Sequence, residues 1–293
     1  MRPTPRMTDS FRLGLIGFPL DHSLSPRIHA AALDACNLAG DYALFPLPPD
    51  DARGLPDLLR RVRSGELHGL NVTVPHKQNV IPLLDDLTPT ARAIGAVNTI
   101  CLRGGKLVGE NTDAPGFLAD LRQFLASQPS TENRRFALVL GAGGSALAVV
   151  HALLTEGWHV TVAARRSEQA RQLMSTFANP KVSIANFPIS NLQNAHFNLL
   201  VNTTPAGMFP HVEQSPLPEN LSLPSTLLVY DLVYNPRETA LVRAARAQGL
   251  SAATGLGMLI EQAALAFEIW TGCNPPRDIL RRAVEDQARN DGD

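Results

Sequence analysis

The feature that most constrains this chain is a glycine turn between an apolar strand and a helix. Residues 136–140 read Phe-Ala-Leu-Val-Leu and run directly into Gly141-Ala142-Gly143-Gly144. Gly141, Gly143 and Ala146 match the G-x-G-x-x-A pattern, in which the glycines permit a tight turn and the approach of a pyrophosphate, while the small third residue lets helix pack on strand. The helix N-terminus would hold the phosphates. The pattern predicts a dinucleotide-binding unit, and an ordinary tight turn is the alternative.

The residues after the next strand indicate which dinucleotide binds. An NAD enzyme would carry Asp or Glu about 20 residues past the fingerprint, where the ribose 2′-hydroxyl lies. Here residues 159–163 predict a strand, and Ala164, Arg165 and Arg166 follow it. A carboxylate would repel a 2′-phosphate, whereas a guanidinium offers paired donors to it. We therefore interpret the two arginines as an NADP site, with solvated surface charge as the alternative.

Composition favours a two-domain protein that recognises small molecules. A chain of 293 residues with 44% hydrophobic residues is long enough for two cores. The net charge of −1 gives no indication of a nucleic-acid or membrane-surface partner. Residues 136–154 lack Asp, Glu, Lys and Arg and could be mistaken for a membrane span. Their central glycines favour a buried strand and helix instead.

The cysteines give no sign of a structural or metal-binding role. Cys36, Cys101 and Cys273 are odd in number, far apart and without C-x-x-C spacing. We therefore expect neither a disulfide framework nor a zinc site, and a reducing cytoplasm fits this pattern.

The first half of the chain predicts an α/β unit of its own. Strands over 12–17, 41–47 and 69–74 alternate with helices from Pro26 and over 51–63, which is a β-α-β-α-β order. Residues 95–100 and 106–109 then flank Arg103-Gly104-Gly105, a pattern typical of a hairpin. Further strands are expected over 182–184, 198–202 and 227–231, followed by an apolar helix through Trp270.

Polar residues follow two of the predicted strands. Ser23 and Ser25 come after the first strand, at the edge where open α/β sheets bind ligands, and their hydroxyls suit a hydroxylated or carboxylated small molecule. Ser25 precedes Pro26, so a helix N-cap is its alternative role. Lys77 follows the third strand at a predicted helix start. A solvated lysine there would oppose the helix dipole, so catalysis is the other reading.

Two residues further along have similarly open roles. Asp113 precedes Ala114-Pro115 and a predicted amphipathic helix, so it is either an N-cap or a functional carboxylate. Gln262 interrupts a largely nonpolar helix surface, and it either satisfies a buried group or touches a ligand.

Taken in order, the motifs show that the chain resembles the shikimate dehydrogenase family, from Leu15 to about Leu280. The resemblance rests on His-Ser-Leu-Ser-Pro (22–26), Asn-Val-Thr-Val-Pro-His-Lys (71–77), Gly-Ala-Val-Asn-Thr (95–99), Asn-Thr-Asp (111–113), Gly-Ala-Gly-Gly (141–144), Asn-Thr-Thr-Pro-Ala-Gly-Met (202–208), Asp-Leu-Val-Tyr-Asn-Pro (231–236) and Gly-Met-Leu-Ile-Glu-Gln (257–262).

The resemblance implies two α/β domains. An N-terminal substrate-binding and catalytic domain would span residues 11–112, with C-terminal helices of about 258–285 returning to it, and a Rossmann-type NADP-binding domain would span 113–257. The implied activity is the NADP-dependent, reversible reduction of 3-dehydroshikimate to shikimate in aromatic amino-acid biosynthesis. The implied enzyme is cytoplasmic and needs no metal, and a homodimer is left open.

The resemblance also implies roles for individual residues. Lys77 and Asp113 would be the catalytic pair, and Ser23 and Ser25 would bind the substrate carboxylate. The other implied substrate-binding residues, for ring hydroxyls or nearby, are Thr73, Asn98, Gln262 and Tyr234. The implied NADP-binding residues are Gly141, Ala142, Gly143, Gly144, Ser145, Ala146, Arg165, Arg166, Thr203, Gly255 and Met258.

The chain departs from the family pattern after its second cofactor-domain strand. NADP-specific members commonly show Asn-Arg-Thr or Asn-Arg-Ser and a later basic residue, whereas here Ala164-Arg165-Arg166 is followed by Gln169. NADP is still expected, and the strength of its preference over NAD is left open.

Three other functions remain as alternatives. The first is a quinate/shikimate dehydrogenase with relaxed substrate or NAD use, although the serines at 23 and 25 favour shikimate. The second is methylenetetrahydrofolate dehydrogenase/cyclohydrolase, for which Tyr-x-x-x-Lys is expected but Thr73 stands four residues before Lys77. The third is a noncatalytic dinucleotide-binding module, against which the presence of Lys77 and Asp113 argues.

Overall fold

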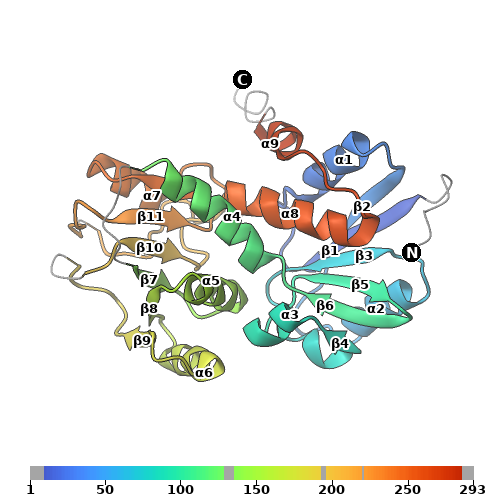
Figure 1. The fold of residues 1–293 in the computed structure, drawn as a ribbon, viewed down its shortest axis with the longest axis horizontal. Coiled ribbons are helices and arrows are strands. Elements are labelled where there is room, and N and C mark those ends of the chain that lie inside the picture. Colours follow the sequence, from blue (N-terminus) through green and yellow to red (C-terminus); the bar gives the residue numbers. More distant parts are fainter. Residues whose placement is uncertain (1–9, 129–134, 193–195, 220, 286–293) are drawn as a thin grey trace. The chain divides into compact units, whose positions relative to one another are not determined.

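The structure, a computed structural model, describes residues 10–128, 135–192, 196–219 and 221–285. The chain divides into two compact units, shown in Figure 1. The first contains the chain up to residue 92, residues 96–112 and the chain from residue 260, and the second contains residues 93–95 and 113–259. The chain thus leaves the first unit and later returns to it. Each unit is built on a sheet with helices, so the predicted class of two α/β domains is confirmed.

The sheet of the first unit is mixed. Its strands are β1 (Phe11–Gly17), β2 (Gly40–Pro46), β3 (Gly69–Val72), β4 (Asp86–Leu87), β5 (Thr99–Arg103) and β6 (Lys106–Glu110). Among the described residues their order is β2-β1-β3-β5-β6-β4. β1 is parallel to β2 and β3, whereas β5 is antiparallel to β3 and β6. The loops that follow β1, β2 and β3 therefore share one edge of the sheet.

Helices from both ends of the chain complete the first unit. They are α1 (Ser25–Ala35), α2 (Gly54–Arg63), the short 3₁₀ helix η1 (Ile81–Leu83) and α9 (Arg277–Glu285), while α3 (Pro89–Ile94) and α8 (Leu256–Thr271) are each divided between the units. α1 and α9 pack side by side (Figure 1). Trp270 of α8 donates its indole N–H to Ile100 O of β5 at 2.9 Å. The C-terminal segment is therefore part of the first unit's core.

A disulfide joins the two ends of this unit. Cys36, directly after α1, and Cys273, between α8 and α9, are bonded with an S–S distance of 2.02 Å. The expectation that these cysteines form no disulfide is wrong. They are 237 residues apart in the sequence, but the packing of α1 against α9 brings them together. Cys101 is buried and free.

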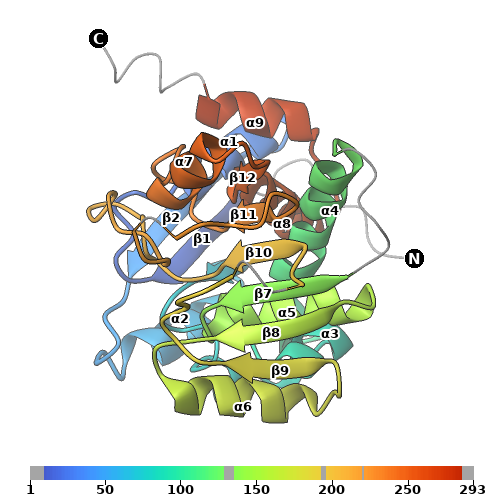
Figure 2. The same ribbon diagram turned by 90° about the vertical axis from the view of Figure 1, so that its left-hand side faces the viewer.

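The sheet of the second unit is parallel throughout. Its strands are β7 (Phe136–Leu140), β8 (His159–Ala163), β9 (Val182–Ala185), β10 (Leu199–Asn202), β11 (Leu228–Asp231) and β12 (Ala252–Thr254). Their order, for the described residues, is β12-β11-β10-β7-β8-β9. Figure 2 shows β10, β7, β8 and β9 side by side with a common direction. The order reverses at β7, and doubly wound sheets bind ligands beside such a reversal, at the carboxyl ends of the strands.

The uncharged run at 136–154 is a buried strand and helix, as expected. Residues 137–140 of β7 are fully buried, which is typical of a central parallel strand. The helices of this unit are α4 (Asp113–Ala126), α5 (Gly144–Thr155), α6 (Ser167–Phe177) and α7 (Ala240–Ala247). Seven residues of α5 are buried, so this helix lies inside the fold.

No helix in the described part of the chain is long and apolar enough to cross a membrane.

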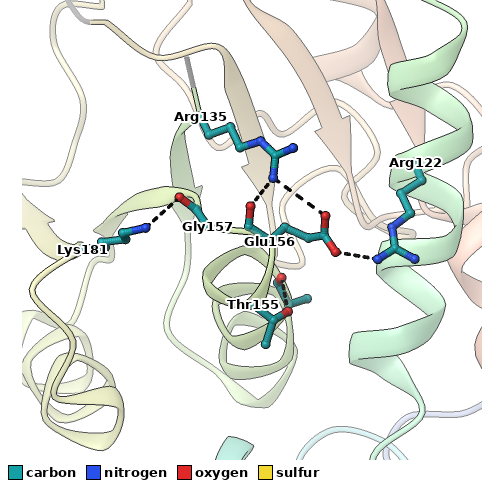
Figure 3. A network of polar contacts seen from close by, with 7 residues as sticks. Arg122, Arg135, Thr155, Glu156, Gly157 and Lys181 are labelled. Carbon is teal, nitrogen blue, oxygen red and sulfur yellow. Dashed lines mark hydrogen bonds and ion pairs between the residues drawn. The ribbon is translucent and has the colours of Figure 1, made fainter. Parts of the chain in front are cut away.

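A polar network fixes the end of α5 that lies away from the glycine turn. Glu156 follows α5, where its negative charge opposes the helix dipole. Arg122 of α4 and Arg135 before β7 offset that charge by pairing with the Glu156 carboxylate, and Arg135 also bonds the Glu156 carbonyl (Figure 3). Lys181 Nζ donates to Gly157 O at 3.2 Å. The network ties α4, α5 and β7 together and so holds the position of α5.

Several element boundaries differ from the sequence prediction. The helix expected from Asp51 begins at Gly54, because Asp51 Oδ1 accepts the N–H groups of Arg53 and Gly54 at 3.0 and 2.9 Å. The hairpin strands are β5 and β6, joined by Gly104 and Gly105 at φ 57° and 77°, the left-handed pair that a type I′ turn needs. Lys77 lies in consecutive turns before η1 and not at a helix start. β4 and α3 were not predicted.

Candidate active site

The glycine turn of the second unit has the geometry that its motif predicts. Gly141 has φ +110°, and a Cβ there would lie 2.5 Å from Thr203 Oγ1, so both conformation and space require glycine. Thr203, after β10, donates its hydroxyl to Leu140 O at 2.7 Å. The turn after β7 and the loop after β10 are therefore in contact at the reversal of strand order.

The start of α5 suits a phosphate group. Gly143 precedes the helix in an extended conformation and makes no side-chain cap, so Gly144, Ser145 and Ala146 present the free N–H groups of a first turn. In the described part of the chain, no heavy atom lies within 4 Å of a Cβ built at Gly143. The protein's own packing therefore does not require glycine here, whereas close approach of a pyrophosphate would. These residues, with Ala142, fit a dinucleotide.

The two arginines predicted to bind a 2′-phosphate lie in the turn that follows β8. Arg165 and Arg166 are exposed in the turn between β8 and α6, and Arg166 is the residue that precedes α6. Within the described ranges, neither guanidinium forms a hydrogen bond or ion pair with the protein. β8 is the neighbour of β7, so both arginines follow the strand next to the glycine turn. Their donors are available for an anionic ligand.

A buried carboxylate fixes the loops after β10 and β11. Asp231 accepts hydrogen bonds from Asn202 Nδ2 at 2.8 Å, Thr239 Oγ1 at 2.6 Å and Val233 N at 3.1 Å. Burial raises the pKa of Asp231 to about 6, and the three donors only partly oppose this. Asn202 Oδ1 also accepts from Thr204 N at 3.0 Å. No role for this cluster could be predicted from the sequence.

Four other candidate residues belong to the second unit. A Cβ at Gly255 would clash with Leu232 O, so this glycine permits close packing against the loop after β11. Met258, in the first turn of α8, is buried. Tyr234 is half-buried, and burial raises the pKa of its phenol above the ordinary value, so the hydroxyl remains neutral. Asp113 is the first residue of α4 and is 5% exposed.

In the first unit, Ser25 is not a helix cap. The residue before α1 is Leu24, which is in the αR conformation and makes no side-chain cap. Ser25 is 6% exposed, and its N–H donates to Ser23 Oγ at 3.3 Å. The N-cap alternative for Ser25 is therefore wrong, and the backbone of Ser25, the first residue of α1, contacts Ser23 in the loop after β1.

Lys77 is buried in the loop that follows β3. Lys77 is only 9% exposed, so the interpretation of this residue as a solvated surface lysine is wrong. Val97 N donates to Lys77 O at 2.8 Å, and the adjacent His76 ring nitrogen Nε2 lies 2.7 Å from Leu47 O after β2. Thr73 begins the same loop, and its O accepts from His76 N at 2.9 Å. The backbone around Lys77 is therefore fixed from several sides.

Asn98 and Gln262 meet, although they are 164 residues apart. Asn98 Nδ2 donates to Gln262 Oε1 at 3.3 Å and to Thr112 Oγ1 at 2.8 Å. Asn98 Oδ1 accepts from Thr112 N at 2.7 Å. Gln262 therefore satisfies a buried polar group, as one of its two predicted roles required, and it does so beside a candidate substrate-binding residue. Thr112 has no assigned role in the sequence analysis.

The candidate residues are divided between the two units. The first unit contains Ser23, Ser25, Thr73, Lys77, Asn98 and Gln262. The second contains Asp113, Tyr234 and all the candidate cofactor residues. Within the described residues, no group of three or more His, Cys, Asp or Glu side chains could hold a metal ion.

Family models match parts of both ends of the chain. Residues 15–100 match the shikimate dehydrogenase substrate binding domain, and residues 255–285 match the shikimate 5′-dehydrogenase C-terminal domain.

Relatives match nearly the whole chain. An NADP⁺ shikimate dehydrogenase of Carboxydothermus hydrogenoformans is 39% identical over 276 residues, which cover 92% of this chain and 95% of the relative. The crystal structure of shikimate 5-dehydrogenase from Thermus thermophilus in complex with NADP(H) and shikimate has a TM-score of 0.82 and 39% identity, covering 94% of this chain and 99% of that one. Quinate dehydrogenase from Corynebacterium glutamicum in complex with NAD has a TM-score of 0.81 and 32% identity, covering 95% and 99%.

Proposed function

This chain belongs to the shikimate dehydrogenase family, and from that premise we propose that it catalyses the NADP-dependent, reversible reduction of 3-dehydroshikimate to shikimate, a step of aromatic amino-acid biosynthesis. The observation that carries the proposal is the similarity to an NADP⁺ shikimate dehydrogenase over nearly the full length of both chains. That similarity covers 92% of this chain, so it extends over both units.

NADP binds to the second unit in this proposal. The N–H groups at the start of α5 hold the pyrophosphate over Gly141, Ala142, Gly143, Gly144, Ser145 and Ala146. Arg165 and Arg166 bind the 2′-phosphate through charge-assisted hydrogen bonds. Thr203, Gly255 and Met258 line the nicotinamide end, at the carboxyl edge of the sheet. Two observations support this assignment: the guanidinium groups are exposed and have no partner among the described residues, and the space at Gly143 is open.

The substrate binds mainly to the first unit. Ser23 and Ser25 donate their hydroxyls to the carboxylate, which accepts up to four hydrogen bonds. Asn98, Gln262 and Thr73 bind the ring hydroxyls, with Tyr234 of the second unit as a further neutral phenol donor. The contact between the Asn98 and Gln262 amides supports their joint role.

Lys77 and Asp113 are the catalytic pair. NADPH, when bound, supplies the hydride that reduces the ketone carbon. The Lys77 ammonium donates a proton from Nζ to the ketone oxygen, and in the reverse direction the neutral amine accepts the hydroxyl proton. The Asp113 carboxylate orients Lys77 and hydrogen-bonds the substrate. The burial of both residues supports this role, because charged side chains are seldom buried without a function or a partner.

A kinetic matrix of shikimate and quinate against NADP and NAD tests the assignment. The absorbance of the reduced nicotinamide measures turnover. We expect the highest kcat/KM for shikimate with NADP. The similarity to an NAD-bound quinate dehydrogenase makes quinate with NAD the second candidate, and a higher kcat/KM for that pair would overturn the proposal. No turnover with any pair would indicate a noncatalytic dinucleotide-binding module.

The proposal also includes a cytoplasmic location and a small-molecule partner. Cell fractionation with the activity assay tests the location. A homodimer and a monomer are the two assembly states considered, and light scattering of the purified protein distinguishes them.

A further inference from the structure

Tyr42 reaches across the sheet of the first unit to a buried amide. It lies on β2 opposite Leu13 of β1, while Asn71 lies on β3 opposite Leu15 of the same strand. These positions share one face of the sheet, because side chains alternate along a strand. The Tyr42 hydroxyl donates to Asn71 Oδ1 at 2.8 Å, spanning β1 between them.

The Tyr42 ring is fixed by aromatic packing. It stacks on the His29 imidazole of α1, with centroids 4.2 Å apart and planes 6° from parallel. His29 is fully buried, and its other side faces Trp270 and Phe267 of α8 at 5.5 and 6.1 Å between centroids. The phenol can therefore move little, and its hydroxyl is held toward Asn71.

From Asn71 the hydrogen bonds lead to the candidate substrate-binding amides. Asn71 Nδ2 donates to Thr99 Oγ1 at 3.2 Å and to Asn98 O at 3.1 Å. The Thr99 hydroxyl in turn donates to Asn98 Oδ1 at 3.1 Å. Asn98 Nδ2 then donates to Gln262 Oε1 at 3.3 Å. Each bond after Tyr42 runs in the same direction, from donor to acceptor, toward Gln262.

All the intermediate groups are buried. Asn71, Asn98 and Thr99 are 5%, 2% and 0% exposed. Without the Tyr42 hydroxyl, the buried Asn71 Oδ1 would lose its 2.8 Å hydroxyl donor, which is costly. Rotation of the Asn71 amide toward another donor would withdraw Nδ2 from Asn98 O and Thr99. The Asn98 side chain would then lose part of the support that fixes it beside Gln262.

We propose that Tyr42 is a positioning residue that orients the Asn98 and Gln262 amides for a hydroxylated ring, acting through Asn71 and Thr99. This inference rests on the proposed function, in which those amides bind the substrate. The series of hydrogen bonds from Tyr42 ends at amides that bind the substrate ring, and it does not reach the groups that transfer the proton. Tyr42 therefore affects substrate affinity.

Tyr42→Phe tests the inference, because it removes the hydroxyl and keeps the ring on His29. We expect the KM for shikimate to rise about fivefold to tenfold, the range that corresponds to loss of one neutral hydrogen bond. The KM for NADP and kcat should change less than about twofold. Tyr230→Phe is the matched control: Tyr230 is a buried tyrosine of the second unit whose hydroxyl donates to Asp120 Oδ2 at 2.5 Å.

Thr99→Val is a second variant on the same chain of hydrogen bonds. It should raise the shikimate KM in the same way, and the double variant should be scarcely worse than the worse single one, since both interrupt one network. Thr99→Val carries the test if Tyr42→Phe does not fold. Equal changes of KM in the Tyr42 and Tyr230 variants, or multiplicative effects in the double variant, would overturn the positioning role alone. A wild type without shikimate turnover would overturn the proposed function, and the positioning role with it.

Discussion

For several residues, burial decides between a structural and a functional interpretation. A lysine in a loop is commonly solvated, and a serine before proline is commonly a helix N-cap. Lys77 is 9% exposed and Ser25 6%, and neither has that role here. A buried ammonium and a buried hydroxyl at the carboxyl edge of a sheet are instead groups that a ligand can use.

Removing the catalytic pair should abolish most of the turnover. We expect Lys77→Ala to lower kcat by about 10²- to 10⁴-fold, the usual contribution of general acid–base catalysis, with both ligands still bound. Asp113→Asn should act similarly, and the double variant should be scarcely slower than the slower single one, because residues that act together are not additive. Lys106→Ala, at an exposed lysine of β6, is the control. Near-normal turnover in Lys77→Ala would remove that residue from the mechanism.

Asp231 should make stability depend on pH. Its pKa in the folded protein, about 6, lies above its ordinary value of 3.8, so the folded state holds the proton more tightly. Its contribution to stability is therefore complete below about pH 4 and is lost as the pH rises to about 6, amounting to about 3 kcal/mol. Asp231→Asn cannot titrate and should lose this dependence.

The measurement is the midpoint of thermal unfolding across that pH window for wild type and Asp231→Asn. Asp57→Asn, at an exposed aspartate of α2, serves as the control and should follow the wild type. If the difference between wild type and Asp231→Asn stays constant with pH, Asp231 does not have the raised pKa.

Most candidate site residues could be found from the sequence because each lies in a short motif. Residues that serve them through space could not. Asp231 meets Asn202 only because β10 pairs with β11, and Tyr42 meets Asn71 only because their strands both flank β1. Such contacts depend on strand order, which a local pattern does not contain.

Elements were predicted best where hydrophobic periodicity is strong. β7 and α5 lie within the uncharged run, and their order around the glycine turn was correct. Element boundaries that are set by side-chain hydrogen bonds were predicted less well, as at the start of α2, where Asp51 bonds the backbone. The turns around Lys77 were read as a helix start because Val97 N, which fixes Lys77 O, comes from a distant part of the sequence.

The turn between β8 and α6 should decide between the two nicotinamide cofactors. We expect Arg165→Ala to raise the KM for NADP about 10- to 100-fold and the KM for NAD far less, since loss of a charge-assisted bond costs about 1.5 to 3 kcal/mol and NAD lacks the 2′-phosphate. Steady-state kinetics with both cofactors provide the measurement.

Arg171→Ala is the control, because Arg171 is an exposed arginine of α6, the helix that follows this turn. Arg166 can also bind the 2′-phosphate, so if Arg165→Ala has a small effect, the double substitution of Arg165 and Arg166 should be measured. An equal rise of both Michaelis constants would contradict the assignment of this turn to the 2′-phosphate.

At the scale of the whole molecule, the chain is organised by its return to the first unit. The segment from residue 260 supplies Gln262, Trp270 and α9 to a unit that begins near the N-terminus. The disulfide between Cys36 and Cys273 adds a covalent link to this return. Closing so long a loop restricts the unfolded chain, which typically stabilises a folded protein by about 2 to 4 kcal/mol. Spacing rules could not predict it, because they consider cysteines that are close in sequence.

The same bond makes a covalent ring of residues 36–273, which has a consequence for cleavage of the polypeptide. A single cut by a protease anywhere in the ring opens it without separating the pieces. After limited proteolysis, we expect one band of full mass on a gel without reductant and two bands with it. Cys36→Ser should give two bands in both lanes, while Cys101→Ser, at the buried free cysteine, should match the wild type. Two wild-type bands without reductant would mean that the ring is open in the purified protein; one band means that a nicked molecule remains a single covalent molecule.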